Sequence, residues 1–123
     1  MQKILQRFTI VIPAADTNSA GEFSLREVLR DDYQKCTGVF IVKEMNTDTG
    51  KIFCRLNIAN IEILPKEVAL MLIEYNGNFA LKESIYNFEK DNIPARSSAV
   101  EMDFTNFIEN EIKLSVYFVL ENQ

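Results

Sequence analysis

Apolar and polar residues alternate with a period of two along much of the chain, which is the pattern of half-buried β-strands. The clearest example is the segment 112–121 near the end of the sequence. Its apolar series points to one side and comprises Ile112, Leu114, Val116, Phe118 and Leu120. The other side carries Lys113, Ser115, Tyr117, Val119 and Glu121. Shorter alternating runs at 8–12, which Pro13 ends, and at 100–104 predict two further strands.

Two further pairs of predicted strands are separated by turn-forming residues, so we interpret them as hairpins. Residues 39–45 are rich in β-branched side chains, residues 46–50 favour a turn, and residues 51–58 alternate again. Asn76 and Gly77 tolerate positive φ at both turn positions and separate 68–75 from 78–85. A helix that begins at Pro65 is the alternative for 65–75, but the Asn-Gly turn favours a strand.

One segment favours a helix. Ser24 and Glu27 form a capping box, and Leu25, Val28 and Leu29 have helical spacing, so a short helix is predicted at about residues 25–35. A strand at 22–25 followed by a structured loop is the alternative. The chain of 123 residues suits one domain, 1–123. The predicted fold is all-β and mainly antiparallel, a β-sandwich or jelly-roll-like fold with about seven or eight strands and at most one short helix near 25–35.

The charge of the chain excludes several classes of partner. It has 18 acidic and 13 basic residues, a net charge of -5, and no basic cluster for a phosphate backbone, so we expect no nucleic-acid binding. Anionic membranes are disfavoured for the same reason, and no apolar run has the length of a membrane span. No signal-peptide pattern occurs, so the expected compartment is the cytoplasm. Cys36 and Cys54 are expected to be buried, reduced thiols.

Catalytic chemistry is poorly represented. The chain has no histidine, and its four glycines are isolated, so nucleophile-base pairs and phosphate-binding loops are not predicted. Two carboxylates can form an acid-base pair without histidine, and the candidates are Asp31, Asp32, Glu101 and Asp103. Each of the four has a sequence context typical of an exposed charge.

A calcium loop is the one metal site that the sequence suggests, and its pattern is incomplete. Asn46, Asp48 and Gly50 alternate in the manner of calcium ligands, but an EF-hand places its glycine one residue later and requires a glutamate near its end. A hairpin turn explains these residues better. We therefore predict no enzymatic activity, no metal and no cofactor.

Some apolar side chains lie where the predicted core does not require them. They fall in a polar stretch, in the loop before the last strand, or on the outer side of that strand, and they either pack beneath loops or form a contact surface. These candidate interface residues are Tyr86, Phe88, Phe107, Ile108, Tyr117 and Val119.

The general plan of the chain resembles a family of virion proteins. The opening segment Phe8-Thr-Ile-Val-Ile-Pro13, a polar loop, the segment Thr37-Gly-Val-Phe-Ile-Val42 and the closing segment Lys113-Leu-Ser-Val-Tyr-Phe-Val-Leu120 carry the likeness. In this plan the chain resembles the small β-sandwich or jelly-roll accessory proteins of bacteriophage virions, of the auxiliary capsid or head and tail connector type, including those of crAss-like phages. No residue-level motif is shared.

The resemblance implies a non-enzymatic virion component without a cofactor, assembled in the host cytoplasm. Its partners would be a capsid or tail protein and copies of itself. Such a docking protein is expected to have an exposed apolar patch or an open strand edge. The alternative is a β-sandwich module that binds a small ligand or a carbohydrate in a site lined by aromatic residues and a few polar groups.

Overall fold

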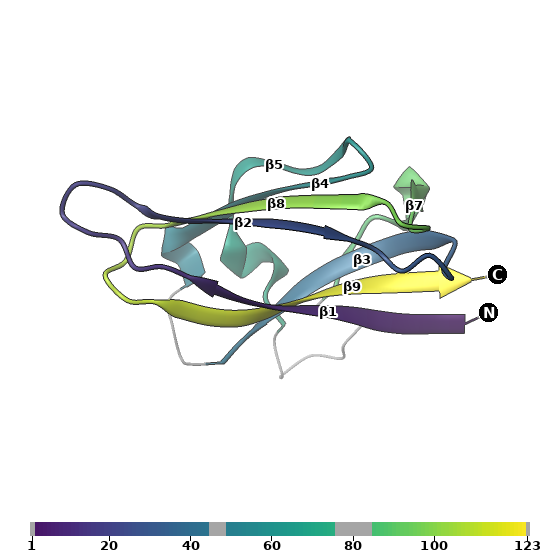
Figure 1. Ribbon diagram of the computed structural model, residues 1–123, viewed down its shortest axis with the longest axis horizontal. Helices are drawn as coiled ribbons and strands as arrows, with labels where there is room; N and C mark the ends of the chain where they lie inside the picture. The colour runs from purple at the N-terminus through teal and green to yellow at the C-terminus, as the bar shows by residue number, and fades with distance from the viewer. Residues whose placement is uncertain (1, 45–48, 76–84, 123) are drawn as a thin grey trace.

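The computed structural model describes residues 2–44, 49–75 and 85–122 and confirms a mainly antiparallel β-sandwich (Figure 1). Sheet A has the order β1 (Gln2–Ile12), β9 (Ile112–Asn122), β3 (Lys35–Lys43) and β6 (Tyr86–Asn87), and β7 (Ile93–Pro94) also pairs with β3. Sheet B has the order β2 (Gly21–Val28), β8 (Ala99–Asn106), β4 (Ile52–Ile58) and β5 (Ile61–Ala69). Three short 3₁₀ turns complete the described elements: η1 (Thr49–Lys51), η2 (Leu70–Ile73) and η3 (Glu89–Asp91).

The core lies between the two sheets, and β9 contributes one of its longest apolar faces. Ile112, Leu114, Val116, Phe118 and Leu120 are all buried, as their alternation predicts. On the opposite sheet, β8 and β4 bury every second residue. The two chain ends lie side by side, since β1 pairs with β9 along its whole length from Gln2 opposite Asn122 to Ile12 opposite Ile112 (Figure 1).

The predicted helix near 25–35 is wrong, and the strand alternative is closer. Residues 21–28 form β2, which pairs with β8 along eight residues without a register shift. The hydroxyl of Ser24 donates to Asp103 on β8 instead of capping a helix. Leu25 is buried while its neighbours Ser24 and Arg26 are exposed, so the alternation of a strand prevails. A backbone ladder with β8 and burial of Leu25 outweigh a local capping signal.

The predicted hairpin between 39–45 and 51–58 is also wrong. The two segments form β3 and β4, but β3 pairs with β9 in sheet A and β4 pairs with β8 and β5 in sheet B. Ile41 on β3 and Leu56 on β4 therefore enter the core from opposite sheets, and both are fully buried there. Placing the strands in opposite sheets lets each bury its apolar face against the other. Residues 45–48, with most of the expected turn, lie outside the described part.

The strand predicted for 68–75 is mostly wrong: only Val68 and Ala69 belong to a strand, the end of β5, and η2 begins at Leu70. Leu70 and Ile73 are fully buried, which fits the three-residue period of a 3₁₀ turn. The backbone N–H of Tyr75 then donates to the carbonyl of Ile41 at 2.7 Å, so η2 carries the chain from sheet B to sheet A. Pro65 lies within β5 and not in a loop, on an edge strand where proline is tolerated. The turn at 76–77 and most of 78–85 lie outside the described residues.

Gly21 is predicted to be the least replaceable glycine of the described structure. A Cβ at this position would lie 1.9 Å from the backbone oxygen of Pro13, which cannot move without shifting the start of the β1–β2 connection. We expect Gly21→Ala to lower the free energy of unfolding by about 3 kcal/mol in urea titrations. Gly38→Ala is the control, because its Cβ would meet the movable side chain of Ile85. Equal stability of the two variants would contradict this account.

Candidate functional site

The six predicted interface residues do not form one surface. Phe88 and Val119 are only 4% and 7% exposed, so burial favours packing over a contact surface for these two residues. Tyr86 is 40% exposed and Phe107 is 58% exposed. Ile108 is half-buried and packs against the core.

Tyr117 belongs to a small aromatic cluster on the outer face of sheet A, and Val119 lies on the same face. The ring of Tyr117 stacks on that of Phe40, with centroids 5.0 Å apart and planes 9° apart, and Tyr75 packs on Phe40 from 6.0 Å. Val119 lies beside Gly38, whose missing side chain leaves room for it and for Ile85. Phe40 and Val119 are thus buried outside the main core. Only the β3–β9 register reveals this, and the sequence pattern did not provide it.

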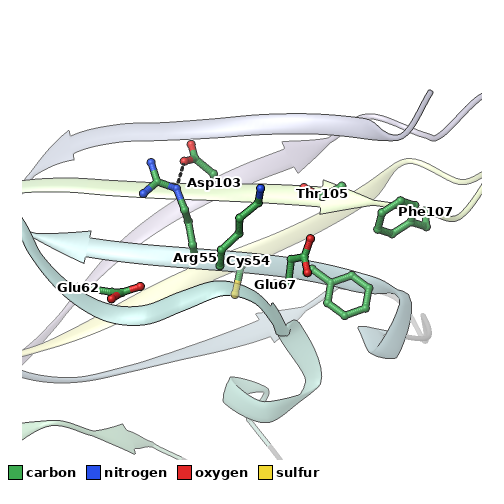
Figure 2. A pocket seen from close by; sticks show the side chains of 9 residues that line it. Cys54, Arg55, Glu62, Glu67, Asp103, Thr105 and Phe107 are labelled. Carbon is green, nitrogen blue, oxygen red and sulfur yellow. Dashed lines mark hydrogen bonds and ion pairs between the residues drawn. The ribbon is translucent and has the colours of Figure 1, made fainter.

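A groove of about 680 Å³ lies on the outer face of sheet B, and we call it the sheet B groove (Figure 2). Its floor comes from β4 and β8, which contribute Phe53, Arg55, Asp103 and Thr105. Its wall comes from β5, with Glu62, Lys66 and Glu67, and Phe107 stands at one end. Of these residues, sequence reasoning singled out only Asp103 and Phe107.

Bulges in β5 make the wall of the groove. Between the pairs Cys54–Val68 and Leu56–Leu64, β4 advances two residues while β5 advances four. The two surplus residues of β5 interrupt the ladder next to Glu67, as in a bulge with more than one extra residue. Glu67 has a φ of 69°, a left-handed conformation that is unfavourable for a residue with a side chain.

Asp103 is the electrostatic centre of the groove floor. Its carboxylate accepts hydrogen bonds from Ser24 Oγ at 2.9 Å, Arg26 Nη2 at 2.9 Å and Arg55 Nε at 2.6 Å. Figure 2 shows the bond to Arg55. Partial burial raises the pKa of Asp103, but these three donors outweigh it and hold the pKa below its usual value. The carboxylate is therefore fixed as an anion and is unsuited to act as a general acid.

The other carboxylates considered for catalysis lie apart from this groove. Asp32 pairs with Arg30 at 2.7 Å, and Asp31 accepts a hydrogen bond from Ser97 at 3.2 Å. Glu101 is half-buried on β8 and does not line the sheet B groove. Across residues 2–44, 49–75 and 85–122, no cluster of three or more possible metal ligands is found.

Strand β1 is a sheet edge, and the hydrogen bonds of β9 show which of its backbone groups are unpaired. Successive residues of an antiparallel strand bond to opposite neighbours. The carbonyls of Lys113 and Glu121 accept from Glu44 and Gln34, at the two ends of β3, so odd-numbered residues of β9 bond toward β3.

The even-numbered residues of β9 consequently bond to β1, where their partners are also even-numbered. The N–H and C=O groups of the odd-numbered residues of β1 point away from the sheet, and no described strand pairs with them. These residues are Lys3, Leu5, Arg7, Thr9 and Val11.

Known proteins give no guide to the function of this chain, so the functional proposal is based on the edge of β1 and the sheet B groove. Neither family models, nor curated proteins, nor solved structures gave a match to this chain. No helix in the described ranges is long and apolar enough to cross a membrane.

The Asp103 network predicts a pH-dependent contribution to stability. A carboxylate whose pKa is lower in the folded state contributes stability above its unfolded value, near 3.8, and loses it as the pH falls through the folded value. Asp103→Asn is therefore expected to be less stable than the original protein at pH 7, and the difference should shrink below pH 3.8. Thermal unfolding of both proteins from pH 7 to pH 2.5 measures this difference in stability. The control is Asp91→Asn, which removes one exposed carboxylate elsewhere, and a pH-independent deficit for Asp103→Asn would contradict the assignment.

Both cysteines are predicted to be unreactive in the folded protein. Cys36 and Cys54 are free and buried, and burial raises the pKa of each thiol to about 12. A disulfide reagent at pH 8 should label neither residue until urea unfolds the chain, because the thiolate is the reactive form. Glu109→Cys, at an exposed position, should be labelled at once. Rapid labelling of Cys36 or Cys54 without denaturant would show that the core is more open than described.

Proposed function

We propose that this protein is a non-enzymatic structural or assembly protein that docks on larger partner proteins as a component of a bacteriophage virion, of the auxiliary capsid or connector type. The open edge of β1 carries the docking part of the proposal. Five outward N–H and C=O pairs along a regular strand of eleven residues form a template to which another chain can add a strand. The virion part rests on the resemblance of the chain to accessory virion proteins.

Most other sheet edges of the described structure are poor templates. β6 and β7 have two residues each, and β5 is interrupted by two register shifts and by Pro65. β2 is regular but shorter, and the side chain of Gln6 donates to the carbonyl of Val28 at its end. Among the described strands, β1 is therefore the long edge strand with a regular register and unpaired outward backbone groups.

The side chains of β1 favour a different protein over a second copy of the same strand. Lys3 and Arg7 are exposed on the outer face, where like charges from a second β1 would oppose self-pairing, and cationic residues of this kind guard natural edges. Leu5 lies between these two cations and Val11 lies farther along the strand, and each is 42% exposed. A partner strand with acidic and apolar residues on one face would complement this surface.

Thr9→Pro tests the docking mode. The N–H of Thr9 points away from β9, so proline should remove one donor and obstruct a partner strand while the β1–β9 ladder stays intact. With tagged chains supplied during phage growth, we expect incorporation into purified virions to fall at least about tenfold, measured by quantitative mass spectrometry, with a change in stability below about 1 kcal/mol. Thr9→Ala keeps the N–H and should incorporate normally.

Two results would count against different parts of the proposal. Normal incorporation of Thr9→Pro would contradict docking through β1. Absence of the unsubstituted chain from purified virions would contradict the virion assignment itself.

A further inference from the structure

We infer that the sheet B groove is a binding site for a short neutral oligosaccharide. This inference is independent of docking through β1, because the groove lies on the face of the other sheet. Its volume of about 680 Å³ is within the range of small-ligand sites. Its residues combine an exposed aromatic ring with both hydrogen-bond donors and acceptors (Figure 2).

The aromatic end of the groove supplies a surface for the C–H face of a sugar ring. Phe107 packs edge-to-face on Phe53, with centroids 5.8 Å apart and planes at 73°. This contact orients Phe107, yet the side chain remains 58% exposed. A held but exposed ring presents a face with negative quadrupole charge, which suits polarised C–H groups.

The polar groups of the groove suit hydroxyl groups, which both donate and accept. Arg55 uses Nε to hold Asp103, and the hydroxyl of Thr105 lies on the same strand as Asp103. Glu62, Lys66 and Glu67 are exposed on the β5 wall and form no ion pair within the described part of the chain. Both carboxylate acceptors and an ammonium donor thus face the groove.

The balance of charge argues for a neutral ligand. Three carboxylates line the groove, from Glu62, Glu67 and Asp103, against two cations, from Arg55 and Lys66. Neither a polyanion nor a polycation finds a surface of opposite sign. An extended peptide would pair its backbone with a strand edge, and the bulges of β5 remove that possibility at this wall. A neutral molecule with hydroxyl groups and an apolar C–H face matches the aromatic end, the mixed donors and acceptors, and the balanced charge of the groove.

NMR titration of the isotopically labelled protein tests this inference. The probes are neutral trisaccharides of glucose, N-acetylglucosamine, mannose, galactose and xylose, with a sulfated trisaccharide and an acidic tripeptide as charged comparisons. We expect at least one neutral trisaccharide at millimolar concentration to shift the amide signals of Phe53, Arg55, Thr105 and Phe107. The charged probes should not shift them.

Phe107→Ala should weaken binding of that trisaccharide at least tenfold and leave the fold intact, because the ring lies largely outside the core. Leu72→Ala removes a side chain that is 69% exposed and does not line the groove, so its affinity should be unchanged. Thr9→Pro should also bind normally, and Phe107→Ala should enter virions normally, which separates this inference from docking through β1. The inference is overturned if no neutral trisaccharide shifts the groove signals, if a charged probe shifts them instead, or if Phe107→Ala binds as well as the unsubstituted protein.

Discussion

The position of β9 between β1 and β3 is the constraint on which the rest of sheet A depends. Its even-numbered side chains fill the core while its even-numbered backbone groups bond to β1, and its odd-numbered backbone groups bond to β3. A shift of one residue would turn Leu114, Val116 and Phe118 toward solvent, so burial fixes the register. With both sides of β9 occupied, β1 is left as the edge of the sheet.

In sheet B, β8 has the corresponding interior position, and the groove on the outer face results from this arrangement. β8 is paired on both sides, by β2 and β4, so its outward residue Asp103 lies between Ser24 and Arg26 on β2 and Arg55 on β4. The register alone brings these four side chains together. β5 is paired on one side only and is free to bulge away from the ladder. The regular interior strands therefore hold the floor, and the irregular edge strand forms the wall.

The sequence predicts the fold class because alternation reports burial directly. The series from Ile112 to Leu120 and the series at Val100, Met102 and Phe104 are buried as expected. The pattern does not report which strands pair, so β3 and β4 were joined in a hairpin although they lie in opposite sheets. At Ser24 a capping signal for a helix at 25–35 competed with a shorter strand pattern at 22–25, and only the ladder with β8 decides between them.

The functional surfaces were harder to predict than the core. Val119 looks exposed by alternation, but it is buried beside Gly38, to which the β3–β9 register pairs it. The sheet B groove draws residues from three strands and depends on bulges that no local pattern marks. The open edge of β1 follows from sheet order, which is a property of the whole fold.

Cryo-electron microscopy of the intact virion tests docking through β1 most directly. If the proposed docking is correct, density for this sandwich lies on the particle, and a strand of another protein continues sheet A beyond β1, bonded to the odd-numbered residues from Lys3 to Val11. A particle that carries the chain with β1 facing solvent, or attached through another surface, would contradict it.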